Sequence, residues 1–103
     1  MKNFYRTQLT PAEVVEAADE FFTALGLTLT ASGPRQRTYQ GIVGEPEVTS
    51  TVRLSVWPEG GHYTFVEVAT DQIGESRIDR NVKRFFVRLH RRTEPSHRLE
   101  AAY

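Results

Sequence analysis

The chain has 103 residues, of which 39% are hydrophobic, 11% aromatic and 25% charged, a composition that predicts one globular domain. It has no cysteine, which excludes a disulfide scaffold, a thiolate metal site and a cysteine nucleophile, and no run of residues approaches the roughly 18 apolar positions of a membrane span. The net charge is zero, but residues 1–75 carry five basic and ten acidic side chains, whereas residues 76–103 carry eight basic and three acidic ones.

The first two predicted elements are a strand and a helix. Alternating residues indicate a strand over 3–9. Thr10 and Glu13 form a capping box, and Pro11 suits the first helical position. Apolar residues then recur at helical spacing until Gly26, whose left-handed conformation is expected to end the helix.

Four further strands are expected in the middle of the chain, because the apolar period changes to two. Three turn-forming segments, Gly-Pro, Gly-Glu-Pro-Glu and Pro-Glu-Gly-Gly, separate these four strands. Connections this short predict an antiparallel meander. The four predicted strands cover residues 27–31, 35–43, 48–57 and 62–70.

A second helix is predicted over 75–92, with an apolar stripe that includes Phe85 and Phe86. The element order is therefore β-α-β-β-β-β-α. One face of the sheet must be covered by both apolar helix stripes, so the predicted fold is a two-layer α+β sandwich with a curved antiparallel sheet. We expect residues 1–92 to form a single domain and residues 93–103 a flexible tail.

The opening residues support a family resemblance. Phe4-Tyr5-Arg6 leads into Leu9-Thr10-Pro11-Ala12-Glu13-Val14, which is similar to the first strand, proline and helix of many START-like (Bet v 1-like, polyketide cyclase-like) helix-grip proteins. The order of elements also resembles the TBP-like arrangement. The START-like resemblance implies a ligand groove between the sheet and the C-terminal helix. The chain lacks room for the additional helix and strands that enlarge the usual START-like cavity.

The turn lengths predict which strand residues face the helices. In a hairpin whose turn has an even number of residues, opposed positions sum to an odd number. We apply this rule to the expected turns at 44–47 and 58–61, each of which has four residues. A shift of the strand 35–43 by one residue would invert its two faces. The polar and aromatic residues expected to face the helices are Arg37, Tyr39, Tyr63, Phe65 and Glu67.

Three interpretations of these residues stay open. In the first interpretation, these residues and Phe86 line a groove and orient an otherwise apolar ligand. Alternatively, the strand 35–43 is a sheet edge whose polar side chains reach water, and Glu67 pairs with an arginine. In a third interpretation, Glu67 and Tyr63 act as acid or base in a minimal START-like cyclase or hydrolase.

The opposite sheet face is expected to carry Trp57, His62, Val66 and Val68. Trp57 and His62 can form a cross-strand pair that shields the backbone. Alternatively, the face is apolar enough to be the contact surface of a homodimer.

The basic C-terminal helix suggests a different function. Its cationic side chains could bind nucleic acid or an acidic protein partner. The acidic first 75 residues oppose nucleic acid, and arginines flanking an apolar stripe are also usual on solvated helices. The residues of this alternative are Arg80, Lys83, Arg84, Arg88 and Arg91.

Motifs for catalysis and cofactor binding are absent from the sequence. It has no dinucleotide-binding glycine motif, P-loop, G-x-S-x-G or H-E-x-x-H, and its three histidines lack metal-ligand spacing. We therefore expect no metal and no cofactor. The sequence favours a small noncatalytic binding domain, cytoplasmic because no apolar export segment is evident, with an apolar molecule as ligand and a homodimer as one arrangement.

Overall fold

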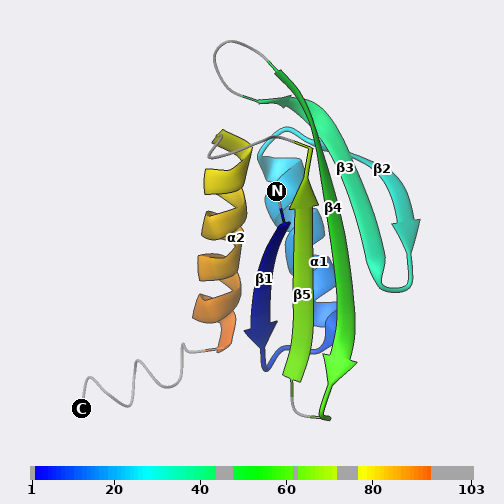
Figure 1. Cartoon of the computed structure of the whole chain (residues 1–103), viewed down its shortest axis with the longest axis vertical. Helices are drawn as coiled ribbons and strands as arrows, with labels where there is room; N and C mark the ends of the chain where they lie inside the picture. Colours follow the sequence, from blue (N-terminus) through cyan, green and yellow to red (C-terminus); the bar gives the residue numbers. More distant parts are fainter. Residues whose placement is uncertain (1, 44–47, 62, 72–76, 94–103) are drawn as a thin grey trace, which may run out of the picture.

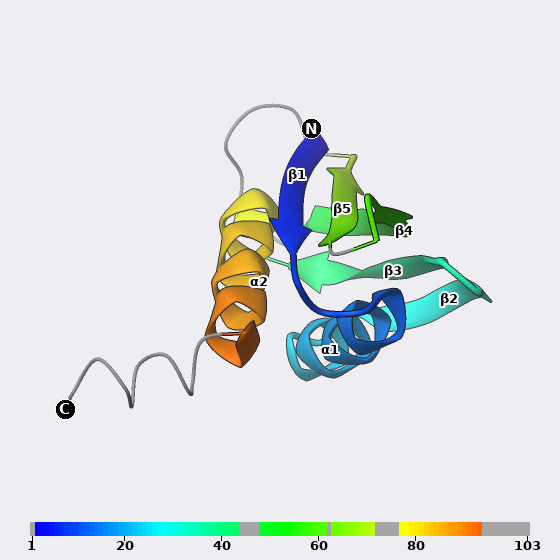
Figure 2. The same ribbon diagram turned by 90° about the horizontal axis from the view of Figure 1, so that it is seen from below.

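The chain folds into a five-stranded antiparallel sheet with two helices on one face, as predicted (Figures 1 and 2). The computed structural model describes residues 2–43, 48–61, 63–71 and 77–93. The sheet is open, with strand order β1-β5-β4-β3-β2. The elements are β1 (Lys2–Thr7), α1 (Pro11–Ala24), β2 (Thr28–Gly33), β3 (Gln36–Val43), β4 (Val48–Glu59), β5 (Tyr63–Thr70) and α2 (Arg77–Thr93).

The predicted capping box begins α1. The Thr10 hydroxyl accepts a hydrogen bond from the Glu13 backbone N–H at 3.2 Å, and the Glu13 carboxylate accepts one from the Thr10 N–H at 3.1 Å. Pro11 is the first helical residue. Gly26 follows the helix with φ 106°, a conformation that favours glycine. Both predicted ends of this helix are therefore confirmed.

The β3–β4 pairing also agrees with the prediction. Arg37 lies opposite Leu54 and Tyr39 opposite Val52, so the opposed positions sum to an odd number. Arg37 and Tyr39 consequently face the helices. The turn at 44–47 and residues 94–103 of the predicted tail lie outside the described residues. Thr93, the first residue of the predicted tail, instead belongs to α2.

The β4–β5 hairpin has a different register, and the prediction for it was wrong. β4 continues through Pro58, and Glu59 pairs with Tyr63, which leaves a loop of three residues instead of four. Gly60 and Gly61 adopt positive φ angles of 63° and 77° there. Because the loop has an odd number of residues, opposed positions sum to an even number, and every side chain of β5 points to the face opposite to the predicted one.

In the observed register, each of the two alternating sets of β5 side chains lies on the sheet face that was predicted for the other set. Val66 and Val68, which we expected on the outer face, are fully buried beneath the helices. Tyr63, Phe65 and Glu67, which we expected to face the helices, lie on the outer face of the sheet. Trp57 lies opposite Phe65. His62, the predicted cross-strand partner of Trp57, lies outside the described residues.

One hydrophobic core fills the space between the helices and the sheet. The rings of Phe22 and Phe85 lie 5.2 Å apart, and Phe22 lies 5.0 Å from Tyr39. The apolar side of α2 is at most 1% exposed, so packed side chains occupy the place where the groove was expected. The α2 residues on this side are Ile78, Val82, Phe85 and Leu89.

Gly41 allows β3 to pass close to the connection between α1 and β2. A Cβ at this position would lie 2.6 Å from the Leu27 Cδ2 atom and 3.1 Å from the Gly26 carbonyl oxygen. The second of these contacts is with backbone, which cannot move aside easily. Any larger residue at Gly41 would therefore push β3 away from the connection between α1 and β2.

Candidate functional site

The six residues predicted to bind a ligand occupy separate parts of the molecule. Tyr63, Phe65 and Glu67 lie on the outer face, where Glu67 is 4.0 Å from the Lys2 ammonium nitrogen. Phe86 stacks on Tyr5 of β1, with ring centroids 5.2 Å apart. Arg37 and Tyr39 come together on the helix side. The set therefore does not form the predicted groove.

Arg37 and Tyr39 instead tie β3 to α1 through Asp19. The Tyr39 hydroxyl donates a hydrogen bond to the Asp19 carboxylate at 2.6 Å. The Nε atom of Arg37 lies 3.3 Å from the same carboxylate, and its guanidinium also donates to the carbonyl oxygens of Gly33 and Gln36. Because Tyr39 is 0% exposed, this cluster joins the helix and sheet layers and offers no open ligand site.

The pKa of Tyr39 is raised well above its ordinary value. Burial is the main cause because it disfavours the phenolate, and the hydrogen bond to Asp19 and the negative charge of Asp19 act in the same direction. Arg37 opposes them. The folded protein therefore retains the Tyr39 proton at a pH where the unfolded chain has lost it.

This shift predicts a loss of stability at alkaline pH. The contribution of protonated Tyr39 is fully present below about pH 10, and above this pH the free energy of unfolding should fall by up to about 1.4 kcal/mol per pH unit. Tyr39→Phe should remove this part of the alkaline slope and cost about 1–2 kcal/mol at neutral pH. Urea unfolding at a series of pH values measures both effects. The control Tyr63→Phe, at an exposed position, should leave the slope unchanged; an equal slope in Tyr39→Phe would contradict the prediction.

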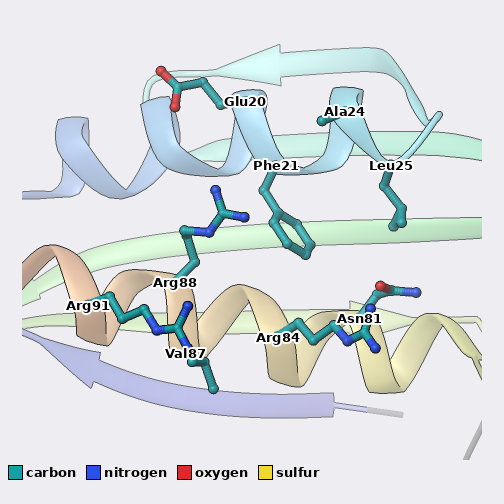
Figure 3. A pocket seen from close by; sticks show the side chains of 9 residues that line it. All are labelled: Glu20, Phe21, Ala24, Leu25, Asn81, Arg84, Val87, Arg88 and Arg91. Atoms are coloured by element: carbon teal, nitrogen blue, oxygen red, sulfur yellow. The ribbon is translucent and has the colours of Figure 1, made fainter.

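A groove of about 450 Å³ lies between the two helices (Figure 3). In Figure 3, Phe21 and Leu25 project from α1 into the space between the helices, and Arg88 reaches from α2 toward α1. The groove therefore combines an apolar wall with basic side chains. Its lining residues are Glu20, Phe21 and Ala24 of α1, Leu25 at the C-cap of α1, and Asn81, Arg84, Val87, Arg88 and Arg91 of α2.

The groove is electropositive. Its carboxylate, Glu20, is held by Arg92 at 2.7 Å. The Arg88 guanidinium carbon lies 5.7 Å from the centre of the Phe21 ring, a cation–π arrangement. Within the described segments, neither Arg84 nor Arg91 forms an ion pair or a hydrogen bond through its side chain. Three guanidinium groups are thus available to an anion.

Helical spacing explains why these side chains meet. Arg84, Arg88 and Arg91 follow one another at intervals of four and three residues, which places them on one face of α2. They belong to the basic set predicted from the sequence, whereas Arg80 and Lys83 do not line the groove. The sequence did not predict the apolar wall, because Phe21 and Leu25 have the same spacing as core residues. Only the packing of α1 beside α2 exposes them to the groove.

A smaller pocket of about 230 Å³ lies beside β1 and the end of α2, and Tyr63 is among its lining residues. There the Tyr5 hydroxyl is 3.3 Å from Nδ1 of His90. Thus Tyr63 is placed near a pocket, but a different one from that predicted.

No protein-family model and no curated protein matches the chain. The resemblance to TBP-like and START-like proteins therefore stays a prediction. None of the helices in the described segments is long and apolar enough to span a membrane. Among the same residues, no three metal-ligating side chains come together.

Proposed function

We propose that this protein is a noncatalytic binding domain that holds a small amphipathic anion in the groove between α1 and α2. The observation that supports this function is the placement of three guanidinium groups over an apolar wall in one groove. The proposal keeps the predicted binding of a partly apolar molecule. It moves the site from the sheet side of α2 to the side that faces α1.

The chemistry of the groove favours a ligand with two parts. Guanidinium groups pair with carboxylate or phosphate oxygens through parallel charge-assisted hydrogen bonds. Phe21, Leu25 and Val87 offer apolar contact to the remainder of the molecule. A volume of about 450 Å³ lies within the usual range of small-molecule sites, about 300–1,000 Å³.

The lining residues support binding rather than catalysis. Among the described residues, the lining includes no histidine, serine, threonine, tyrosine or lysine, and its carboxylate, Glu20, is paired with Arg92. A general base needs a titratable group within hydrogen-bond reach of the substrate. Such a group is missing from this lining, so the groove can hold an anion without transforming it.

Titration calorimetry with dodecanoate tests the proposal, with dodecyltrimethylammonium as a cationic probe of equal chain length. Dodecanoate should bind and the cation should not. Replacing the groove arginines should weaken dodecanoate binding at least about tenfold, since one charge-assisted hydrogen bond contributes about 1.5–3 kcal/mol. The test variant carries Arg84→Gln, Arg88→Gln and Arg91→Gln.

A matched control variant removes the same number of positive charges at other positions on the surface. Its three exposed positions lie outside the groove, so dodecanoate affinity should stay within about twofold of wild type. Equal affinity in both triple variants, or equal binding of the cation, would overturn the proposal. Oligonucleotide binding that falls equally in both variants, with no dodecanoate binding, would instead assign the arginines to nonspecific nucleic-acid contact. The control carries Arg35→Gln, Arg53→Gln and Arg80→Gln.

A further inference from the structure

The groove between α1 and α2 carries its cationic groups at separate points along its length. Arg84 and Arg91 are seven residues apart, which corresponds to about 10.5 Å along the helix axis at about 1.5 Å per residue. Both side chains start on the same face of α2, and the side chains of a helix lean toward its N-terminus. The two guanidinium groups therefore lean in the same direction and stay apart. Figure 3 shows the Arg84 side chain extending toward Asn81, away from Arg91.

The section of the groove between these two arginines is aromatic and apolar. Phe21 projects into it from α1 (Figure 3), and Val87 of α2 is also among the lining residues. Arg88 lies in this section too, with its guanidinium carbon 5.7 Å from the centre of the Phe21 ring. The face of the ring partly compensates this cation. The groove thus presents one cation near each end and an apolar centre.

The cations at the two ends need separate anionic partners. Within the described part of the lining the acidic residue is Glu20, and Arg92 holds it at 2.7 Å. A carboxylate accepts charge-assisted hydrogen bonds from a guanidinium group at about 2.7–2.9 Å. A carboxylate bound at this distance to Arg84 cannot at the same time reach a guanidinium group about 10 Å further along the helix. One anionic group therefore satisfies only one end of the groove.

We infer that the preferred ligand is an elongated molecule with an apolar middle and an anionic group at each end, one held by Arg84 and the other by Arg91. The inference rests on the proposed function, because it names the class of anion that the groove takes. An α,ω-dicarboxylate has this form. Its two carboxylates pair with the two end cations while its chain lies on the Phe21 ring. A molecule with one anionic group would leave one of these arginines without a partner.

Titration calorimetry with three probes tests the inference at about pH 8, where the carboxyl groups of all three are ionised. The probes are dodecanedioate, dodecanoate and nonylpropanedioate. Nonylpropanedioate is an isomer of dodecanedioate with the same two charges, but both of its carboxylates lie at one end of the chain. Dodecanedioate should bind at least about tenfold more tightly than either of the others, because it alone gains a charge-assisted hydrogen bond at both ends of the groove.

Removal of either end arginine should abolish this preference. In Arg84→Gln and in Arg91→Gln, dodecanedioate can pair through one carboxylate only, so its affinity should fall to within about twofold of that of dodecanoate. Both variants should behave in this way, whichever end a monocarboxylate prefers. The control Arg80→Gln removes a cation four residues before Arg84 and outside the groove, and it should keep the full preference. Circular dichroism checks that each variant is folded.

The possible results separate this inference from the proposed function. If dodecanoate binds and dodecanedioate binds no more tightly, the two-ended ligand is wrong and the proposed function stands. Equal affinity for dodecanedioate and nonylpropanedioate would assign the preference to charge alone and would also overturn the inference. A preference retained in Arg84→Gln or in Arg91→Gln would overturn the pairing of one carboxylate with each arginine. If none of the three probes binds, the proposed function and this inference both fail.

Discussion

Val66→Asp should unfold the protein at neutral pH. Val66 is fully buried at the centre of β5, in register between Val56 of β4 and Tyr5 of β1. A carboxylate there would be removed from water and would gain no cationic partner. Such a change costs several kcal/mol, a large part of the roughly 5–15 kcal/mol that stabilises a typical domain. Circular dichroism and urea unfolding would show the loss directly.

The matched control is Ala69→Asp, three residues further along the same strand. Ala69 lies on the outer face, in register between Lys2 of β1 and Arg53 of β4. A carboxylate there stays in contact with water and between two cations, so the free energy of unfolding should change by no more than about 0.5 kcal/mol. If Val66→Asp were tolerated and Ala69→Asp were not, the register of β5 would be the one first predicted from turn length.

Phe85→Ala should destabilise the fold by about 3–5 kcal/mol. The Phe85 ring is fully buried and lies 5.6 Å from the ring of Phe21 and 5.2 Å from that of Phe22, so it holds α2 against α1 as well as against the sheet. Its removal leaves a cavity that the neighbouring rings can fill only in part. The midpoint of urea unfolding should fall, and the slope of the transition should stay constant if the protein still unfolds in one step.

Two neighbouring residues on α2 serve as controls for Phe85. Phe86→Ala removes a ring that is only partly buried and stacks on Tyr5, so its cost should be smaller than that of Phe85→Ala. Val87→Ala changes an exposed residue and should alter the free energy of unfolding by no more than about 0.5 kcal/mol. Equal losses at all three positions would mean that helix propensity, rather than packing, determines the effect.

Local signals predicted the helices well. Thr10, Pro11 and Glu13 act within one turn of α1, so the sequence contains all the information needed to place its start. The β3–β4 register could be predicted for a similar reason, since the pairing of Arg37 with Leu54 follows from the spacing between the two strands. The class of the fold followed from these elements.

The β5 faces could not be derived from turn length alone. Pro58 and Glu59 resemble turn residues, yet both belong to β4, and this difference changed the loop from four residues to three. The apolar alternation of β5 itself, with Val66 and Val68 on one side and Glu67 on the other, indicated the observed faces. Along a strand packed on helices, burial of the valines outweighs the turn preference of a proline.

The site was harder to predict than the fold. The helical spacing of Arg84, Arg88 and Arg91 shows in the sequence that they share a face, but not what lies opposite that face. What lies opposite this face depends on the packing of α1 against α2, and this packing places Phe21 and Leu25 beside the arginines. Similarly, Asp19 is an ordinary helix-surface residue in the sequence, and only the tertiary structure brings it to Tyr39.

The position of β1 affects the order in which the chain can fold. β1 is translated first, but its strand partner in the described sheet is β5, and Tyr5 stacks on Phe86 of the last helix. An emerging chain can pair β2, β3 and β4 while β1 still has no place to dock. Closure of long loops of this kind slows folding. We therefore expect this fold to reach its native state only after α2 has been synthesised, with β1 and α2 docking together as the last event.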